Sequence, residues 1–308
     1  MKNIEKLLPP IVGRRPHAAI FLSGTGSNAE QILRRNQEML AQGKEIPYDL
    51  QVLVTDAPET SRARELGRVY GIPVIEEDIR AFYQAHGEER ISIRTPKAQD
   101  LRNQWSDRLR VKLRPYAIDF AVFAGFVPLT NLTADFPCLN VHPGELTYLK
   151  DGRRYLIGLH QLPVELAMLE GLEALRSSVI LARPYTGKGE DMDNGPLLGI
   201  SPEVPIDLKG EKVEALRAIA AARPDKRPAG GYKDRLAELA ALNLERLKRG
   251  GDWQVLPGVV RDFAKGCYAL SDDNQLFYRI GGKFHPVETV QVDGDQREPI
   301  FASGQPIS

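Results

Sequence analysis

The first half of the chain alternates short apolar runs with longer segments in which apolar residues recur at helical spacing. The apolar run at residues 18–22 is followed by a helical pattern over residues 28–40. A second apolar run, over residues 50–56, precedes a helical pattern that ends at Gly71, and glycine is typical of the position just after a helix. This alternation predicts strands linked by helices, which favours neighbouring strands that run parallel.

The alternation continues to residue 126. Residues 72–78 predict a third strand, and Thr95 with Pro96 can form the N-cap and first turn of the next helix. The apolar positions of that helix recur every four residues, at Leu101, Trp105, Leu109 and Leu113. Residues 118–126 are apolar on both faces, as expected of a central strand that helices cover on each side. We therefore predict an α/β fold with a Rossmann-like, doubly wound, mostly parallel sheet and helices on both faces.

The last third of the chain has a different pattern. Residues 209–251 predict two helices separated by a connector rich in proline, glycine and basic residues. Residues 266–294 contain strand-like runs separated by Asp-Asp-Asn and Gly-Gly turns, which predict a β-meander. We therefore expect an α/β domain over residues 1–255 and a small C-terminal β extension over residues 256–308. The extension could cap the sheet, join a homodimer or form part of a substrate site, and the pattern leaves these alternatives open.

Composition and charge narrow the class of protein. Forty-one basic and forty-one acidic residues among 308 give a formal net charge of zero, so nothing argues for a nucleic-acid or membrane surface. Cys138 and Cys267 lie far apart in the sequence and suit neither a metal site nor a disulfide framework. No apolar run is long enough to span a bilayer, and residues 1–16 lack the apolar core of a signal peptide. We expect a soluble protein of the reducing cytoplasm that uses no metal.

A glycine-rich loop, SGTGSN at residues 23–28, lies between the first strand and the first helix. Backbone amides at such a junction can hold an anion. The glycines fit a permissive dinucleotide fingerprint, but Asp56 lies well beyond the spacing at which an acidic residue would hold a ribose. A Walker-type loop is excluded because no Gly-Lys-Ser/Thr follows. Three interpretations stay open here: a phosphate or other small anion, a dinucleotide, or a turn that binds nothing.

Candidate catalytic side chains follow later strands. Asn140 and His142 are two residues apart at the end of a short apolar run, so strand geometry places both side chains on the same face. An amide can donate to an oxyanion, and an imidazole can carry a proton near neutral pH. Residues 187–195 form a glycine-bounded acidic loop that contains Asp193, whose carboxylate could orient the imidazole. Each feature alone has a structural alternative, because strand-end histidines and acidic loops often have no chemical role.

Taken together and in this order, these motifs resemble the formyltransferase superfamily, and most closely its phosphoribosylglycinamide formyltransferases of purine synthesis. The resemblance covers residues 18–200 and includes SGTGSN at 23–28, DFAVFAGFVPL at 119–129, LNVHP at 139–143, GLH at 158–160 and DMDNGP at 191–196. It implies three sets of site residues: Thr25, Gly26, Ser27 and Asn28 for a substrate phosphate, Asn140, His142 and Asp193 for catalysis, and Val127, Leu129, Glu190, Asp191 and Met192 for the folate.

The chemistry that the resemblance implies is formyl transfer. The amine of a phosphorylated small molecule attacks the formyl group of 10-formyltetrahydrofolate, which is the co-substrate. Asn140 stabilises the oxyanion, His142 moves the proton from the amine to the folate nitrogen, and Asp193 biases His142 and helps to order a relaying water. Glycinamide ribonucleotide is the first candidate for the amine.

Departures from the family pattern concern the substrate sites. Pro128 stands where the family usually has Arg or a similar residue near the folate. A segment that borders the amine site in the family is several residues longer here, at residues 145–157. The longer segment adds charged residues at Lys150, Asp151, Arg153 and Arg154. Glu238 is the nearest candidate for the family glutamate that contacts the ribose. These changes leave the identity of the amine open.

Two other functions remain as alternatives. A hydrolase could release formate from the same folate with water in place of the amine, although hydrolysis alone would not need the loop at residues 23–28. From a different class, the chain could be a nicotinamide-dependent oxidoreductase or a nucleotide-binding protein that uses the Rossmann-like loop.

Overall fold

The structure is a computed structural model and describes residues 3–184, 193–228 and 230–301. Its largest sheet contains β2 (His17–Phe21), β3 (Asp49–Thr55), β4 (Val74–Glu76), β5 (Phe120–Phe123), β6 (Cys138–His142), β10 (Ser178–Ala182), β11 (Leu197–Ile200), β16 (Thr289–Asp293) and β17 (Gln296–Ile300). Across the described residues the strand order is β17–β16–β11–β10–β6–β5–β2–β3–β4. Strands β2 to β6 form a parallel block, whereas β10 runs antiparallel to both of its neighbours. The predicted mostly parallel sheet is confirmed.

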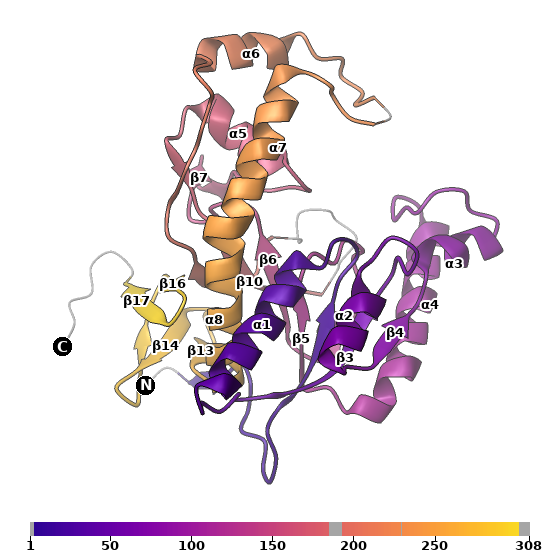
Figure 1. The fold of residues 1–308 in the computed structure, drawn as a ribbon, viewed down its shortest axis with the longest axis vertical. Helices are drawn as coiled ribbons and strands as arrows, with labels where there is room; N and C mark the ends of the chain where they lie inside the picture. Colours follow the sequence, from indigo (N-terminus) through magenta and orange to yellow (C-terminus); the bar gives the residue numbers. More distant parts are fainter. Residues whose placement is uncertain (1–2, 185–192, 229, 302–308) are drawn as a thin grey trace.

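Helices cover both faces of this sheet (Figure 1). The helices of the described residues are α1 (Ser27–Ala41), α2 (Ala63–Tyr70), α3 (Ile79–Ala85), α4 (Pro96–Leu113), α5 (Leu162–Glu170), α6 (Val213–Ala221), α7 (Arg235–Leu247) and α8 (Trp253–Ala264), with short 3-10 turns η1 (Arg114–Tyr116) and η2 (Asn131–Ala134). Helices α1, α2 and α8 share a core on one face, and α3 and α4 share a core on the other. The doubly wound arrangement is confirmed, although α3 was not among the predicted elements.

The two cores are separate because side chains alternate along each strand. In β2, Ile20 belongs to the core beneath α1 and α8, whereas Phe21 belongs to the core beneath α4. In β5, Val122 and Phe123 divide in the same way. Burying a side chain of this size contributes about 1.5–3 kcal/mol, so burial on both faces holds these strands firmly in place. This explains why the central strands are continuous apolar runs.

The predicted helix ends are confirmed. The hydroxyl of Thr95 accepts a hydrogen bond from the backbone N–H of Ala98, which caps α4, and Pro96 occupies the first turn. Gly71 ends α2 with φ of 69°, in the left-handed region that favours glycine.

A second group of helices stands above the sheet in Figure 1. Helices α5, α6 and α7 share an apolar core of their own, which also includes Leu156 and Leu175. Two short strand pairs belong to this group: β7 (Leu149–Lys150) with β8 (Arg153–Arg154), and β9 (Ala174–Leu175) with β12 (Val204–Pro205). We call this group the upper lobe. The hairpin β7–β8 lies within the predicted insertion at residues 145–157.

Helices α7 and α8 are joined by a π-helical turn, η3 (Lys248–Asp252), and form one long rod in Figure 1. A Cβ on Gly251 would lie 2.4 Å from Ser177 Oγ and 3.0 Å from Leu247 Cδ1, so this close packing requires glycine. The predicted domain boundary between residues 255 and 256 lies inside α8. The chain stays helical through Gly250 and Gly251 and continues directly into that helix.

The C-terminal strands divide between two sheets. Strands β13 (Tyr268–Ser271), β14 (Leu276–Ile280) and β15 (Lys283–Pro286) form the predicted antiparallel meander, and β1 (Ile4–Lys6) pairs with β13. Strand β16 leaves the meander and pairs parallel with β11, and β17 then extends the large sheet. The C-terminal extension therefore caps one edge of the large sheet.

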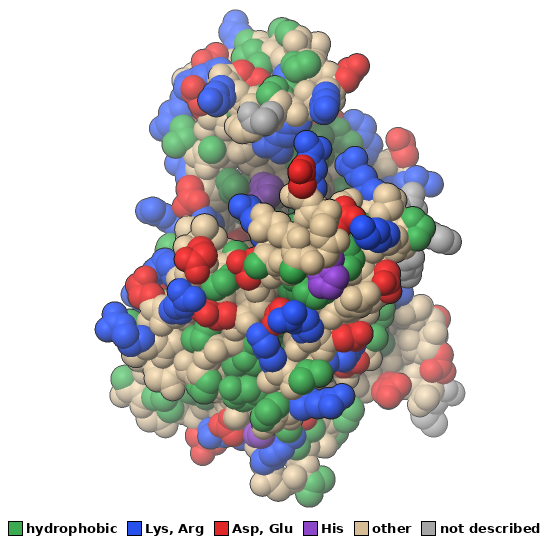
Figure 2. Space-filling view, turned by 90° about the vertical axis from the view of Figure 1, so that its right-hand side faces the viewer, with side chains coloured by type: hydrophobic (Ala, Val, Ile, Leu, Met, Phe, Trp, Pro, Cys, Tyr) green, Lys and Arg blue, Asp and Glu red, His purple; other side chains and the backbone are tan. Residues whose placement is uncertain are grey.

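The surface carries charges of both signs. On the face shown in Figure 2, basic and acidic side chains are interspersed and do not gather into one large patch. None of the helices in the described segments is both long and apolar enough to cross a bilayer.

Candidate active site

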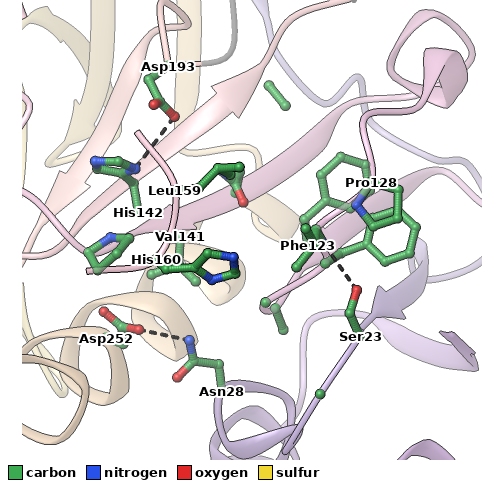
Figure 3. Close-up of a pocket in the computed structure, with 18 of the residues that line it drawn as sticks. Ser23, Asn28, Phe123, Pro128, Val141, His142, Leu159, His160, Asp193 and Asp252 are labelled. Atoms are coloured by element: carbon green, nitrogen blue, oxygen red, sulfur yellow. Dashed lines mark hydrogen bonds and ion pairs between the residues drawn. The ribbon is translucent and has the colours of Figure 1, made fainter. Parts of the chain in front are cut away.

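A cavity of about 440 Å³ lies at the carboxyl ends of β2, β5 and β6 (Figure 3). Ligands bind at this position in open α/β sheets. Its lining comes from residues 23–28, 123–130, 140–143 and 158–160, together with Thr133, Ala182, Arg183, Asp193, Leu244, Lys248 and Asp252. The structure thus brings together the described members of all three predicted sets: Thr25 to Asn28, then Val127 and Leu129, then Asn140, His142 and Asp193. Glu190, Asp191 and Met192 lie outside the described residues.

The glycine-rich loop leaves the first helix without a capping side chain. Gly26 is the N-cap of α1, and within the described residues no side chain accepts a hydrogen bond from the first turn. Gly26 has φ of 65°, and a Cβ there would lie 2.8 Å from Leu22 Cδ1 and 2.9 Å from Leu66 Cδ1. The position therefore requires glycine on both counts. The amides of the first turn are left available to an anion, which the positive end of the helix dipole favours.

The base of this loop is held by buried polar contacts. The hydroxyl of Ser23 donates to Asp56 Oδ1 at 2.5 Å and accepts from the backbone N–H of Val127 at 2.9 Å. Burial raises the pKa of Asp56, and the Ser23 hydrogen bond partly offsets that effect. Asp56 therefore fixes the start of the loop through its hydrogen bond with Ser23. Ser23 also links the loop to the segment around Val127.

The side chain of Asn28 is held by Asp252. Its Nδ2 donates to Asp252 Oδ2 at 2.8 Å, and the Ser177 hydroxyl donates to Asp252 Oδ1 at 2.5 Å. Asp252 is buried, and burial raises the pKa of its carboxyl group. Asp252 was not among the predicted site residues. The only signal for it in the sequence is an acidic residue that follows Gly-Gly at the end of a helical pattern. In the structure this residue lies in the π-helical turn η3, and such turns occur frequently at functional sites.

In Figure 3 His142 lies above Asp252 and Asn28, and its ring has an acceptor near each nitrogen. Its Nε2 is 2.7 Å from the backbone oxygen of Leu156, and its Nδ1 is 3.6 Å from Asp193 Oδ1. A carbonyl oxygen can only accept, so Nε2 carries a proton. In the neutral ring Nδ1 then keeps its lone pair, and this nitrogen is the one nearer to the carboxylate of Asp193.

Two further polar side chains reach the cavity. Asn140 lies two residues before His142 on β6, and both line the cavity, as the strand alternation predicted. Within the described part of the chain the Asn140 amide has no hydrogen-bonding partner. His160, from the predicted GLH motif, also lines the cavity and has φ of 57°, an unusual conformation for a residue other than glycine.

The side of the cavity assigned to the folate is mostly apolar. Phe123, Phe126, Val127, Pro128 and Leu129 all line it. The backbone oxygen of Leu129 accepts a hydrogen bond from the buried Arg102 at 2.9 Å, which anchors this segment to α4. An apolar wall with anchored backbone groups suits a flat aromatic ring.

Glu238 is not at the cavity. It lies on α7, 63 % exposed, and pairs with Arg235 at 3.4 Å. Asp252, at the end of η3 further along the same rod, is the acidic residue that contacts the loop. The expectation for Glu238 was therefore wrong, because sequence position alone could not show which part of the rod faces the cavity.

In the described residues no cluster of three or more His, Cys, Asp or Glu side chains is arranged to hold a metal ion. No family model matches the chain, and no curated protein matches it in sequence.

Solved structures nevertheless share its fold. Phosphoribosylglycinamide formyltransferase from Coxiella burnetii aligns over 88% of this chain and 96% of its own, with 17% identity and a TM-score of 0.54. The enzyme of the same name from Anaplasma phagocytophilum aligns over 88% and 97%, with 16% identity and a TM-score of 0.51. Formyltetrahydrofolate deformylase from Burkholderia mallei aligns over 88% and 72%, with 15% identity and a TM-score of 0.51. The chain therefore shares the fold of these solved enzymes, as its motifs led us to expect.

Proposed function

We propose that this protein transfers the formyl group of 10-formyltetrahydrofolate to the amine of a phosphorylated small molecule. The observation that carries the proposal is one cavity with three parts in the order that this chemistry needs. An uncapped helix N-terminus lies at one end, an apolar wall lies at another, and Asn140 and His142 lie side by side on β6.

The carbon–nitrogen exchange would occur beside Asn140. The amine nitrogen attacks the formyl carbon, the new C–N bond forms, and the carbonyl oxygen becomes an oxyanion. The unpartnered amide of Asn140 can donate to that oxygen, and one such donor typically contributes about 3 kcal/mol to transition-state stabilisation. Collapse of the intermediate then breaks the bond to the folate nitrogen.

The proton would travel through Nδ1 of His142. Because Leu156 holds the proton on Nε2, the lone pair of Nδ1 can take the proton that the amine loses, directly or through a water. Asp193, 3.6 Å away, stabilises the imidazolium that results. The same nitrogen then returns the proton to the folate nitrogen as it leaves, so the reaction is proton-neutral for the enzyme.

The phosphate of the amine substrate would bind at the loop. The backbone amides of the first turn of α1 and the hydroxyls of Thr25 and Ser27 are donors suited to a dianion. One N–H of the Asn28 side chain donates to Asp252, so its second N–H and the backbone N–H of Asn28 remain as donors. Glycinamide ribonucleotide remains the first amine to test, and Asp252 is an acidic side chain of the cavity lining that contacts the loop through Asn28.

The test is the absorbance change that accompanies loss of the formyl group from 10-formyltetrahydrofolate. It is followed with a phosphorylated amine, with the same amine after dephosphorylation, and with no amine. Turnover that requires the phosphorylated amine supports the proposal. Turnover without any amine would identify a hydrolase, the activity named for the Burkholderia mallei structure. Absence of turnover together with binding of a nicotinamide nucleotide would replace the proposal with the oxidoreductase alternative.

A further inference from the structure

The hairpin β7–β8 belongs to the insertion at residues 145–157, for which the sequence suggests no role. Its strands pair Leu149 with Arg154 and Lys150 with Arg153. The chain then runs to Leu156, which is completely buried in the core of the upper lobe. The hairpin is therefore anchored to the upper lobe, and its last residues lie over the end of β6.

Two residues of this short segment contact the two members of the His142–Asp193 pair. The Nη1 of Arg154 donates to the backbone oxygen of Asp193. The backbone oxygen of Leu156 accepts from His142 Nε2 at 2.7 Å. The same three-residue stretch thus holds the imidazole from one side and the backbone of its carboxylate partner from another.

The close approach of this segment depends on a glycine. A Cβ on Gly144 would lie 2.6 Å from the Leu156 oxygen and 2.9 Å from His142 Nε2. Any larger residue at 144 would therefore push the segment away from the imidazole. The contact between Leu156 and His142 is a built feature of this chain, since it needs both the inserted segment and Gly144.

Burying the charge of Arg154 costs free energy of solvation. Its guanidinium is partly buried, and burial lowers its pKa, while the charge of Asp193 acts in the opposite direction. The side chain of Arg153, one residue earlier, is exposed. The guanidinium of Arg154 is thus partly removed from water, whereas that of Arg153 is not. The buried guanidinium donates its hydrogen bond to the backbone oxygen of Asp193.

We propose that Arg154 is a positioning residue that holds the backbone of Asp193 so that the carboxylate faces Nδ1 of His142. The peptide oxygen of Asp193 is fixed by the guanidinium, and this fixes the direction in which its side chain leaves the backbone. The hairpin is then the element that couples the upper lobe to proton transfer. The expected effect on rate rests on the proposed function, whereas the geometry of the pair does not.

The first test is a spectroscopic one that needs no activity. The chain has five histidines, so the ring nitrogens of His142 can be followed by ¹⁵N NMR and assigned by loss of signal in His142→Gln. Asp193→Asn provides the reference for an imidazole without its carboxylate. Arg154→Met is expected to move the His142 signals toward that reference, and the matched control Arg153→Met is expected to leave them in place. Arg154→Lys, which keeps the charge and can still donate to the Asp193 oxygen, should restore part of the wild-type position.

The second test is kinetic. We expect Arg154→Met to lower kcat roughly 100-fold, because a small displacement of a catalytic group has an effect of this order, with KM for both substrates nearly unchanged. Arg153→Met should retain wild-type kcat, and thermal unfolding should show that all variants fold. If Arg154→Met matches Arg153→Met in the NMR spectrum, the positioning role is overturned, whatever the activity. If the NMR shift appears but the wild-type chain transfers no formyl group, the positioning role stands and the proposed function fails.

Discussion

Two carboxylates line the same cavity, and their surroundings differ. Asp252 accepts hydrogen bonds from two neutral donors, Asn28 at 2.8 Å and Ser177 at 2.5 Å. Asp193 instead faces the Nδ1 of His142 across 3.6 Å, a distance too long for a good hydrogen bond. In Figure 3 these two groups lie at the bottom and the top of the view.

The difference separates binding from proton transfer. Each carboxylate oxygen of Asp252 accepts a hydrogen bond from a neutral side chain, so Asp252 holds Asn28 and the start of α1 in one geometry. His142 and Asp193 are arranged around a nitrogen that can gain and lose a proton. We therefore expect substitutions at the His142 end to change kcat, and substitutions at the Asn28 end to change KM or stability.

The largest effect is expected for His142→Gln. It removes the group that carries the proton, so kcat should fall about 10²–10⁴-fold while KM for both substrates changes little. Steady-state rates of formyl transfer measure this. His285→Gln is the control, because His285 lies on β15 in the separate C-terminal sheet, and it should keep the wild-type rate. Near-normal kcat in His142→Gln would remove the proton carrier from the proposed mechanism.

Asn140→Ala should have the next largest effect. Loss of an oxyanion donor is expected to lower kcat about 10²–10³-fold. The fold should be retained, because the Asn140 side chain is only partly buried and faces the cavity. Circular dichroism and the unfolding midpoint check the fold alongside the rate. A variant that folds normally and keeps its rate would show that the oxyanion lies elsewhere.

Ser27→Ala tests the loop. A hydrogen bond to a charged group is worth about 1.5–3 kcal/mol, so KM for a phosphorylated amine should rise roughly tenfold or more. The KM for the folate should not change, nor should the much higher KM for the dephosphorylated amine. Equal losses for phosphorylated and dephosphorylated amines would mean that the loop serves only as a scaffold.

The smallest effect concerns Asp252 and stability. Because burial raises its pKa in the folded state, the folded chain binds this proton more tightly than the unfolded chain does. The free energy of unfolding should therefore decrease as the pH rises from near 3.8 through the raised folded pKa. Asp252→Asn keeps an acceptor for Asn28 and removes the titration, so its stability should depend less on pH in that window. Urea unfolding at several pH values compares the two slopes, and parallel curves would contradict the prediction.

Local sequence patterns determined much of this protein. The apolar runs predicted β2, β3 and β5, because burial on two faces leaves a direct signature in the sequence, and helical spacing predicted α1, α2 and α4 but not α3. Thr95, Pro96 and Gly71 predicted helix ends, since their effects are confined to one turn of backbone. The spacing of Asn140 and His142 predicted a shared face, because side chains alternate along any strand.

Only the tertiary structure decided which distant residues complete the cavity. Asn28 and Asp252 are 224 residues apart, and Arg154 reaches Asp193 across 39 residues, so no local pattern connects them. The predicted helical span ended at residue 251, yet the chain stays helical there, with Gly250 and Gly251 packed against Val204 and Ser177, and this carries Asp252 to the loop. Contacts of this kind depend on how close-packed elements meet, and the interior of a protein, unlike a turn or a cap, is specified by all of its neighbours together.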